Sequence, residues 1–265
     1  MNARTIGPGD RNAWTVDEQR ISLVRAPRPS RPVTIDALPV AVELDLARTA
    51  LIIVDMQNDF CHPDGWLASI GVDVSGARGA VDALVTNLPA IRRADVPVLW
   101  VNWGTFPGRM NLPPNALHVY DPEGRGVGIG SIEPTGHPVL QRGSWGAAVV
   151  DELLAPRAAD GADTWIAKHR MSGFWDTELD SVLRNLAVDT LLFAGVNADQ
   201  CVLATLIDAA CAGYDVVLLE DASATTSPAF CWDATLYNVR QCFGFTTTLV
   251  SIAEAVSSSI AGGAT

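Results

Sequence analysis

The sequence predicts an α/β fold, in which a doubly wound, mostly parallel six-stranded sheet carries helices on both faces. Two observations support this. Short apolar runs of strand length alternate about six times with segments of helical periodicity. These runs are continuously apolar, as expected for parallel strands buried on both faces. The length of 265 residues and the hydrophobic content of 48% suffice for one such domain with a sizeable core.

Each element follows from its own pattern. The expected strands, in chain order, are RTALIIVDM, VPVLWVNW, TWIAK, TLLFAGV, YDVVLLED and TTTLVS. The expected helices lie at about 77–94, 145–154, 176–187, from Cys201 onward, and 229–242. Right-handed crossovers between parallel strands then place helices over both faces of the sheet.

Two segments depart from this alternation. Residues 1–45 contain scattered arginines and prolines without a sustained period, which predicts an extended N-terminal arm before a domain spanning 46–265. Residues 104–143 are rich in glycine and proline and too long for a simple connection, so we expect a lid or binding loop. The GRGVGIG stretch within them neither follows a strand nor opens a helix, which argues against a dinucleotide-binding loop.

Composition narrows the class of protein. The net charge of −12 disfavours nucleic acid as a partner, because a phosphate backbone would be repelled. The sequence shows neither a signal-peptide pattern nor an apolar run long enough to span a bilayer, so we expect a cytoplasmic protein without a membrane partner. The five cysteines lack CxxC spacing, which favours reduced thiols over disulfides or a thiolate zinc site.

Three chemically distinct groups follow the carboxyl ends of predicted strands. Asp55 ends the first strand, Lys168 ends the third, and Cys201 follows the fourth after a short turn. Lys168 is also the only lysine in the chain. Each residue alone is compatible with a structural role. Because functional crevices in open α/β sheets lie at the carboxyl ends of strands, the three together predict an active site.

The chemistry of these groups suggests roles. Cys201 opens a predicted helix, where unpaired N–H groups and the macrodipole favour a thiolate; the alternative is a small buried hydrophobe. A carboxylate such as Asp55 can serve as base and then acid in amide cleavage, and Lys168 supplies the positive charge that separates it from a thiolate. Backbone N–H groups of Asn197 or Ala198, together with that of Cys201, are candidates for an oxyanion hole.

Three motifs in this order, LIIVDMQNDF, KHRMSGFWDTEL and GVNADQCVLATLIDAACAGYDVVLLEDA, resemble those of the isochorismatase-like cysteine hydrolases over roughly residues 45–250. The resemblance implies a catalytic triad of Asp55, Lys168 and Cys201 and a cis peptide between Val196 and Asn197. Nicotinamidases of the family carry an aspartate and histidines as metal ligands where this chain reads VNWGTF. We therefore expect neither a metal nor an organic cofactor.

The substrate is less defined. Isochorismatases themselves lack the cysteine, so Cys201 favours amide hydrolysis, and the chain resembles most the ureide branch of biuret hydrolase, triuret hydrolase and N-carbamoyl amidases. The main expectation is cleavage of a small linear ureide of the triuret or biuret type through a thiocarbamoyl intermediate, releasing ammonia or a small amine. The alternatives are a nicotinamidase or ureidoacrylate-type amidase using the same triad, or a non-catalytic member that binds a small ligand.

Candidate substrate-binding residues complete the prediction. Gln241 falls where biuret hydrolase has a substrate-binding glutamine, although it is equally compatible with a helix surface. Phe60, Trp103 and Trp175 are candidates for a flat slot around a planar substrate, although most such residues belong to cores or interfaces. The arm has too little apolar periodicity to fold alone, which predicts a homo-oligomer, a dimer or tetramer, with the arm at its interface.

Overall fold

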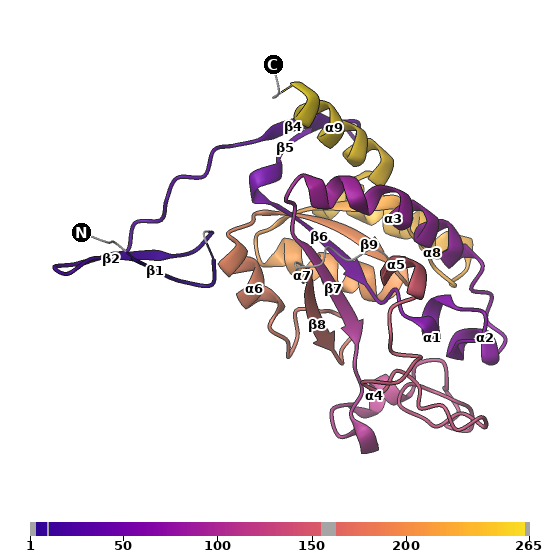
Figure 1. Ribbon diagram of the computed structural model, residues 1–265. Helices are drawn as coiled ribbons and strands as arrows, with labels where there is room; N and C mark the ends of the chain where they lie inside the picture. The colour runs from indigo at the N-terminus through magenta and orange to yellow at the C-terminus, as the bar shows by residue number, and fades with distance from the viewer. Residues whose placement is uncertain (1–3, 10, 155–162, 263–265) are drawn as a thin grey trace.

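A six-stranded parallel sheet forms the centre of the computed structural model, which describes residues 4–9, 11–154 and 163–262 (Figure 1). The strands lie in the order β11-β10-β9-β6-β7-β8. Their bounds are β6 (Thr49–Val54), β7 (Val98–Trp103), β8 (Thr164–Lys168), β9 (Thr190–Gly195), β10 (Asp215–Ser223) and β11 (Phe245–Thr247). Every pairing within this sheet is parallel, which confirms the predicted fold class.

Helices cover both faces of the sheet. Helices α3 (Gly76–Arg93) and α9 (Leu249–Gly262) pack together over one face (Figure 1). The crossovers through α6 (Leu179–Leu186), α7 (Leu203–Cys211) and α8 (Ala229–Asn238) run in the opposite direction along the sheet and therefore cover the other face. Strand β6 is fully buried along its length because both of its faces are covered.

The short elements lie mostly at the carboxyl edge of the sheet or in connections. They are η1 (Leu46–Arg48), α1 (Asn58–Cys61), α2 (Trp66–Ser69), η2 (Pro107–Arg109), α4 (Pro114–Leu117), α5 (Asp151–Leu154), η3 (Ala198–Val202) and η4 (Val239–Phe243). The segment 104–143, called the lid segment below, contains η2 and α4 and is otherwise irregular. Within the described residues, none of the helices is long and apolar enough to cross a bilayer.

The last predicted strand is partly wrong. We expected TTTLVS to be extended, but β11 ends at Thr247 and Leu249 begins the 14-residue helix α9. The carboxylate of Asp221, which belongs to β10, accepts hydrogen bonds from the backbone N–H groups of Leu249 (2.6 Å) and Val250 (3.2 Å). The helix start is therefore held by a residue distant in sequence as well as by a local cap, because the hydroxyl of Thr248 accepts the backbone N–H of Ser251 (3.1 Å).

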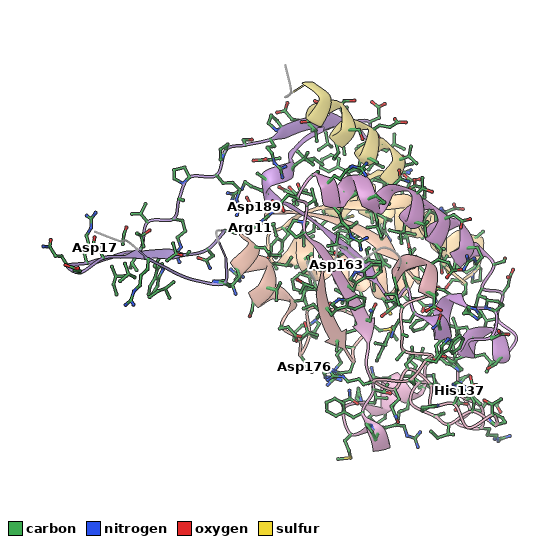
Figure 2. All side chains as sticks on the ribbon, viewed as in Figure 1. Arg11, Asp17, His137, Asp163, Asp176 and Asp189 are labelled. Carbon is green, nitrogen blue, oxygen red and sulfur yellow. The ribbon has the colours of Figure 1, made fainter. Side chains whose placement is uncertain are left out.

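The N-terminal residues form two small sheets. Strands β1 (Arg4–Ile6), β2 (Trp14–Val16) and β3 (Ile21–Ser22) make an antiparallel sheet that projects from the body (Figure 1). Figure 2 shows Asp17 far out on this projection and Arg11 near the body, where its guanidinium donates to the carbonyl oxygen of Asp95 (2.8 Å). Strands β4 (Pro32–Ile35) and β5 (Val42–Asp45) form a hairpin against α9. Residues 1–3 and 10 of the expected arm lie outside the described residues.

Candidate active site

Asp55 follows β6 at the carboxyl edge of the sheet and is completely buried. Its backbone has a positive φ of 53°, a conformation that aspartate tolerates better than most residues. Oδ1 accepts the backbone N–H of Trp103 (3.0 Å), and Oδ2 lies 2.8 Å from Nζ of Lys168. The carboxylate is thus held from two neighbouring strands.

Lys168 ends β8 and reaches Asp55 across β7, because the strand order places β7 between β6 and β8. Trp103, at the end of β7, lies under this lysine, with Nζ 4.2 Å from the centroid of its ring. Nζ also donates to the carbonyl oxygen of Arg170 (3.2 Å). The only lysine of the chain is therefore a fully buried ammonium compensated by a carboxylate, a carbonyl and an aromatic face.

Cys201 lies in the π-helical turn η3 rather than at the first residue of α7, and only 5% of it is exposed. Its thiol is within hydrogen-bonding reach of the Asp55 carboxylate, and its Sγ lies 3.7 Å from Sδ of Met171. The turn can approach β6 closely because Gly195 ends β9: a Cβ there would lie 2.0 Å from the carbonyl oxygen of Val54. The structure therefore brings Asp55, Lys168 and Cys201 together.

The protonation state of the nucleophile differs from the expectation. Burial raises the pKa of the Cys201 thiol to about 12, although the charge of Lys168 lowers it. Burial likewise raises the pKa of Asp55, against the opposing effect of Lys168. The direction of this shift is opposite to the one expected from the helix terminus, because burial outweighs the effects of Lys168 and Trp103 that lower the pKa of the thiol. The arrangement favours a neutral thiol next to a carboxylate of increased basicity, as a general base requires.

The turn before Cys201 contains the expected cis peptide between Val196 and Asn197. The backbone N–H of Ala198 donates to the carbonyl oxygen of Ala224 (2.8 Å), so this group is already engaged and does not fit the role of an oxyanion donor. The side chain of Asn197 instead ties the turn together, because its Oδ1 accepts the backbone N–H of Thr226 (3.1 Å). Of the expected donors, the N–H groups of Asn197 and Cys201 remain candidates.

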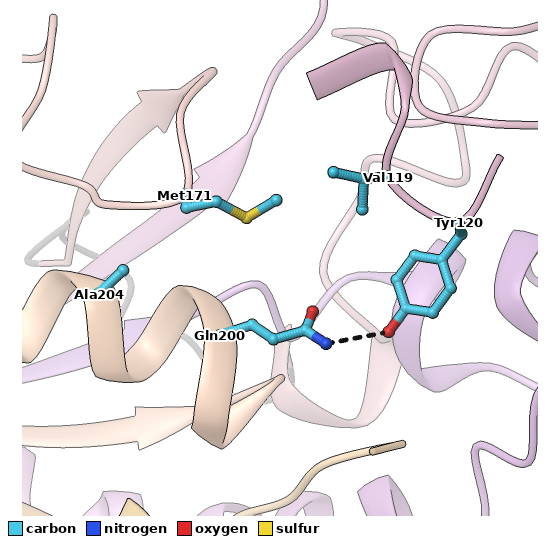
Figure 3. Close-up of a pocket in the computed structure, with 5 residues that line it drawn as sticks. All are labelled: Val119, Tyr120, Met171, Gln200 and Ala204. Carbon is cyan, nitrogen blue, oxygen red and sulfur yellow. Dashed lines mark hydrogen bonds between the residues drawn. The ribbon is translucent and has the colours of Figure 1, made fainter. Parts of the chain in front are cut away.

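A pocket of about 510 Å³ lies near the triad, since its lining includes Met171, which contacts Cys201, and Gln200, which precedes it in sequence (Figure 3). It is lined by Val119 and Tyr120 of the lid segment, by Met171, and by Gln200 and Ala204, which flank the cysteine in sequence. None of these lining residues is charged, and three of them are apolar. The pocket suits the uncharged part of a small substrate.

Tyr120 joins the lid segment to the turn that carries the nucleophile. Its hydroxyl accepts hydrogen bonds from Nδ2 of Asn197 (3.1 Å) and Nε2 of Gln200 (3.4 Å) and lies 3.1 Å from the hydroxyl of Thr226. Figure 3 shows the Gln200 contact across the pocket. Sequence reasoning predicted the lid segment but not Tyr120, since no local pattern distinguishes this residue from its neighbours.

Gln57 is a second residue that the sequence prediction missed. Its side chain is fully buried, accepts the backbone N–H of Trp103 (2.9 Å) and donates to the carbonyl oxygens of Trp103 (2.9 Å) and Ala147 (2.7 Å). It therefore fixes the end of β7, on which both Asp55 and Lys168 depend. Its position two residues after Asp55 was the only signal for it.

The expected substrate-binding residues are mostly elsewhere. Gln241 is exposed in η4, before β11, and lines a separate hollow with Tyr237 and Arg240, so within one chain it does not line the pocket near Cys201. Trp175 is 63% exposed and does not line the pocket.

The other two aromatic candidates are part of the supporting structure. Phe60 is buried edge-on against Trp66, and Trp103 is buried beneath Lys168, so neither forms a wall of the pocket. The shared reason for these errors is that aromatic composition gives no information on which side chains face a cavity. Across the described residues, no three His, Cys, Asp or Glu side chains are grouped as metal ligands.

Comparisons with known proteins agree with this geometry. The family model described as the isochorismatase domain matches residues 49–251. Ureidoacrylate amidohydrolase RutB of Rhizobium rhizogenes is 34% identical over 239 residues, which cover 86% of this chain and 91% of that protein.

Among solved structures, a cysteine hydrolase from Pseudomonas syringae pv. phaseolicola matches with a TM-score of 0.67 and 26% identity, covering 82% of this chain and 95% of that one. N-carbamoylsarcosine amidase from Thermoplasma acidophilum matches with a TM-score of 0.57 and 26% identity, covering 76% and 96%. The resemblance stated from the motifs is thereby confirmed. The chain belongs to the isochorismatase family of hydrolases, and its relatives place it among the amidohydrolases of that family.

Proposed function

We propose that this protein is a cysteine amidohydrolase that cleaves the terminal carbamoyl group from a small ureido compound with a short carbon chain, of the ureidoacrylate type. The observation that carries the proposal is the contact of Asp55 with both Lys168 and Cys201 beside an uncharged pocket. Asp55 as general base, Lys168 as balancing cation and Cys201 as nucleophile are the groups that amide hydrolysis of this kind requires.

The proposed reaction proceeds in two halves. Asp55 takes the proton of Cys201 as Sγ bonds to the carbamoyl carbon, and backbone N–H groups of Asn197 and Cys201 stabilise the oxyanion. The C–N bond then breaks, and the leaving amine or ammonia takes the proton from Asp55. Asp55 next removes a proton from water, which attacks the thiocarbamoyl carbon; the C–S bond breaks, and Cys201 regains a proton as the carbamate leaves.

Two observations favour a ureidoacrylate-type substrate over triuret or biuret. The named relative acts, by its name, on ureidoacrylate. Val119, Met171 and Ala204 also give the pocket apolar walls, which suit a carbon chain better than the alternating carbonyl and N–H groups of triuret.

The test is product release from ureidoacrylate, N-carbamoylglycine, biuret, triuret and nicotinamide, with the wild type and Cys201→Ser. The ureido acids should be hydrolysed best, and the variant should be inactive on all of them. Faster turnover of triuret or biuret would restore the first expectation from sequence. Preference for nicotinamide, or equal rates with Cys201→Ser, would contradict the proposal.

We also propose that the projecting arm packs on a second copy of the chain. The arm exposes large apolar side chains that a monomer would leave in water. These are Ile6, Trp14, Ile21, Leu23 and Val24. Light scattering should give a dimer or tetramer, and deletion of residues 1–24 should reduce that mass; a monomeric full-length chain would contradict the proposal.

A further inference from the structure

Trp103 contacts each member of the triad through a different group. Its backbone N–H donates to Oδ1 of Asp55, and the face of its ring lies under the ammonium of Lys168. Its side chain also lowers the pKa of the Cys201 thiol, although burial raises that pKa overall. None of the other residues described above acts on Asp55, Lys168 and Cys201 together.

The indole N–H of Trp103 is unusual among the buried tryptophans. Nε1 of Trp66 donates to the carbonyl oxygen of Val127 (2.6 Å), and Nε1 of Trp100 donates to the carboxylate of Asp163 (2.9 Å). Nε1 of Trp103 is buried and, in the described part of the chain, has no partner at ordinary hydrogen-bonding geometry. Buried donors in native proteins almost always have an acceptor, so an unused one at an active site needs an explanation.

The reaction itself supplies the missing acceptor. A neutral thiol accepts hydrogen bonds weakly, whereas an anion accepts them strongly. When Asp55 takes the proton of Cys201, the sulfur becomes an anion in a site from which water is largely excluded. Besides Lys168, the nearby indole N–H is then the group able to stabilise it.

We propose that the indole N–H of Trp103 donates a hydrogen bond to the sulfur of Cys201 as it becomes a thiolate, which makes Trp103 a catalytic residue. The proposal rests on the proposed function only in requiring Cys201 to be the nucleophile. It replaces the role expected from sequence, because a residue that is 2% exposed and covered by Lys168 has no free ring face for a substrate.

The experiment removes the N–H and keeps the ring. Trp103→Phe retains an aromatic face and the backbone N–H. Benzothienylalanine introduced at position 103 retains both fused rings and replaces the N–H by sulfur. Trp100→Phe is the matched control, since it removes an indole N–H from the same strand that bonds Asp163 instead. The measurement is the rate of Cys201 alkylation by iodoacetamide from pH 7 to 10, followed by mass spectrometry of the peptide, alongside kcat/KM.

Both variants at position 103 should slow alkylation of Cys201 and lower kcat/KM by about tenfold, as expected for loss of one hydrogen bond to an anion. Trp100→Phe should change neither by more than about twofold, whatever it does to stability. Alkylation at the wild-type rate in the benzothienylalanine protein would overturn the proposal, including when kcat/KM falls, since the indole would then serve the substrate. If both variants at position 103 slow the alkylation of Cys201 as expected but the wild type hydrolyses none of the ureides, the proposed function would be contradicted instead.

Discussion

Two buried carboxylates only four residues apart, Asp55 and Asp59, have opposite surroundings. Burial raises the pKa of both. Asp55 faces an ammonium and a thiol. Asp59 accepts the backbone N–H groups of Leu140 (2.7 Å) and Trp66 (3.2 Å), and the side chains of Glu133 and His137 have opposing effects on its pKa. Two aspartates that are buried to a similar degree thus differ in role: Asp55 contacts the reactive groups, and Asp59 attaches the lid segment.

The comparison shows that partners, rather than burial, distinguish a reactive group from a structural one. Asp59 acts on the pocket indirectly, because Leu140 belongs to the lid segment and Trp66 packs edge-on against Tyr120, with ring centroids 5.7 Å apart. Asp59 therefore supports one wall of the pocket, whereas Asp55 forms part of the reacting group.

The largest difference is expected between Asp55→Asn and Asp59→Asn. Asp55→Asn removes the general base, so kcat should fall by at least about 10⁴-fold. Asp59→Asn leaves the triad intact and should change kcat by less than about tenfold, with the main effect on KM. Steady-state kinetics on the best ureide measure both. Comparable losses of kcat would show that the two carboxylates do not differ in role.

Lys168→Arg should lower kcat by about 10²-fold. The planar guanidinium cannot occupy the place of an ammonium between Asp55 and the ring of Trp103, and displacement of reacting groups by about 1 Å has costs of this size. Arg184→Lys is the control, because its ion pair with Asp180 is exposed on α6. An active Lys168→Arg enzyme would mean that only the charge matters.

Gly146→Ala should affect the lid attachment without touching the triad. A Cβ at position 146 would lie 2.2 Å from the carboxylate of Asp59, so that carboxylate must move away from Leu140. We expect a loss of about 1–3 kcal/mol in the free energy of unfolding and a raised KM. The control is Gly79→Ala, where a Cβ on α3 meets open space. Equal effects in urea unfolding would contradict this account.

The pH dependence of stability provides a smaller test. Since the pKa of Asp59 is raised above its ordinary 3.8 in the folded chain, its protonated form is favoured by folding. The resulting stabilisation is fully present below about pH 3.8 and is lost as pH rises through the folded pKa. Asparagine cannot titrate, so the stability of the wild type relative to Asp59→Asn should decrease between pH 4 and 7.

This decrease should be about 1.4 kcal/mol for each tenfold difference in proton affinity between the folded and unfolded chains. Urea unfolding of both proteins at several pH values measures it. A difference that stays constant would show that folding leaves the pKa of Asp59 unchanged, and one that grows with pH would show that the folded chain prefers the ionised carboxylate; either result would contradict this account.

Gln241→Ala should have the smallest effect, with kcat/KM on every ureide within about twofold of the wild type. The residue is exposed in η4 and lines a hollow distinct from the pocket at Cys201. A selective loss of biuret hydrolysis would instead support its expected contact with substrate, through a neighbouring copy of the chain.

The local sequence pattern was sufficient to predict the strands of the central sheet and the residues of the triad. Continuous apolar runs identify the strands, and Asp55, Lys168 and Cys201 could be recognised because each follows or ends such a run. The start of α9 was missed, because its local cap, Thr248, stands within the TTTLVS run expected to be extended. Its other cap, Asp221, lies on another strand.

The sequence by itself thus determined the fold class and which three residues share the carboxyl edge of the sheet. Only the tertiary structure decided that the ammonium of Lys168 lies between Asp55 and the ring of Trp103, that Tyr120 borders the pocket, and that Gln241 does not. It also decided that the pKa of Cys201 is raised rather than lowered, because desolvation depends on everything packed around the sulfur and not on the residues beside it in sequence.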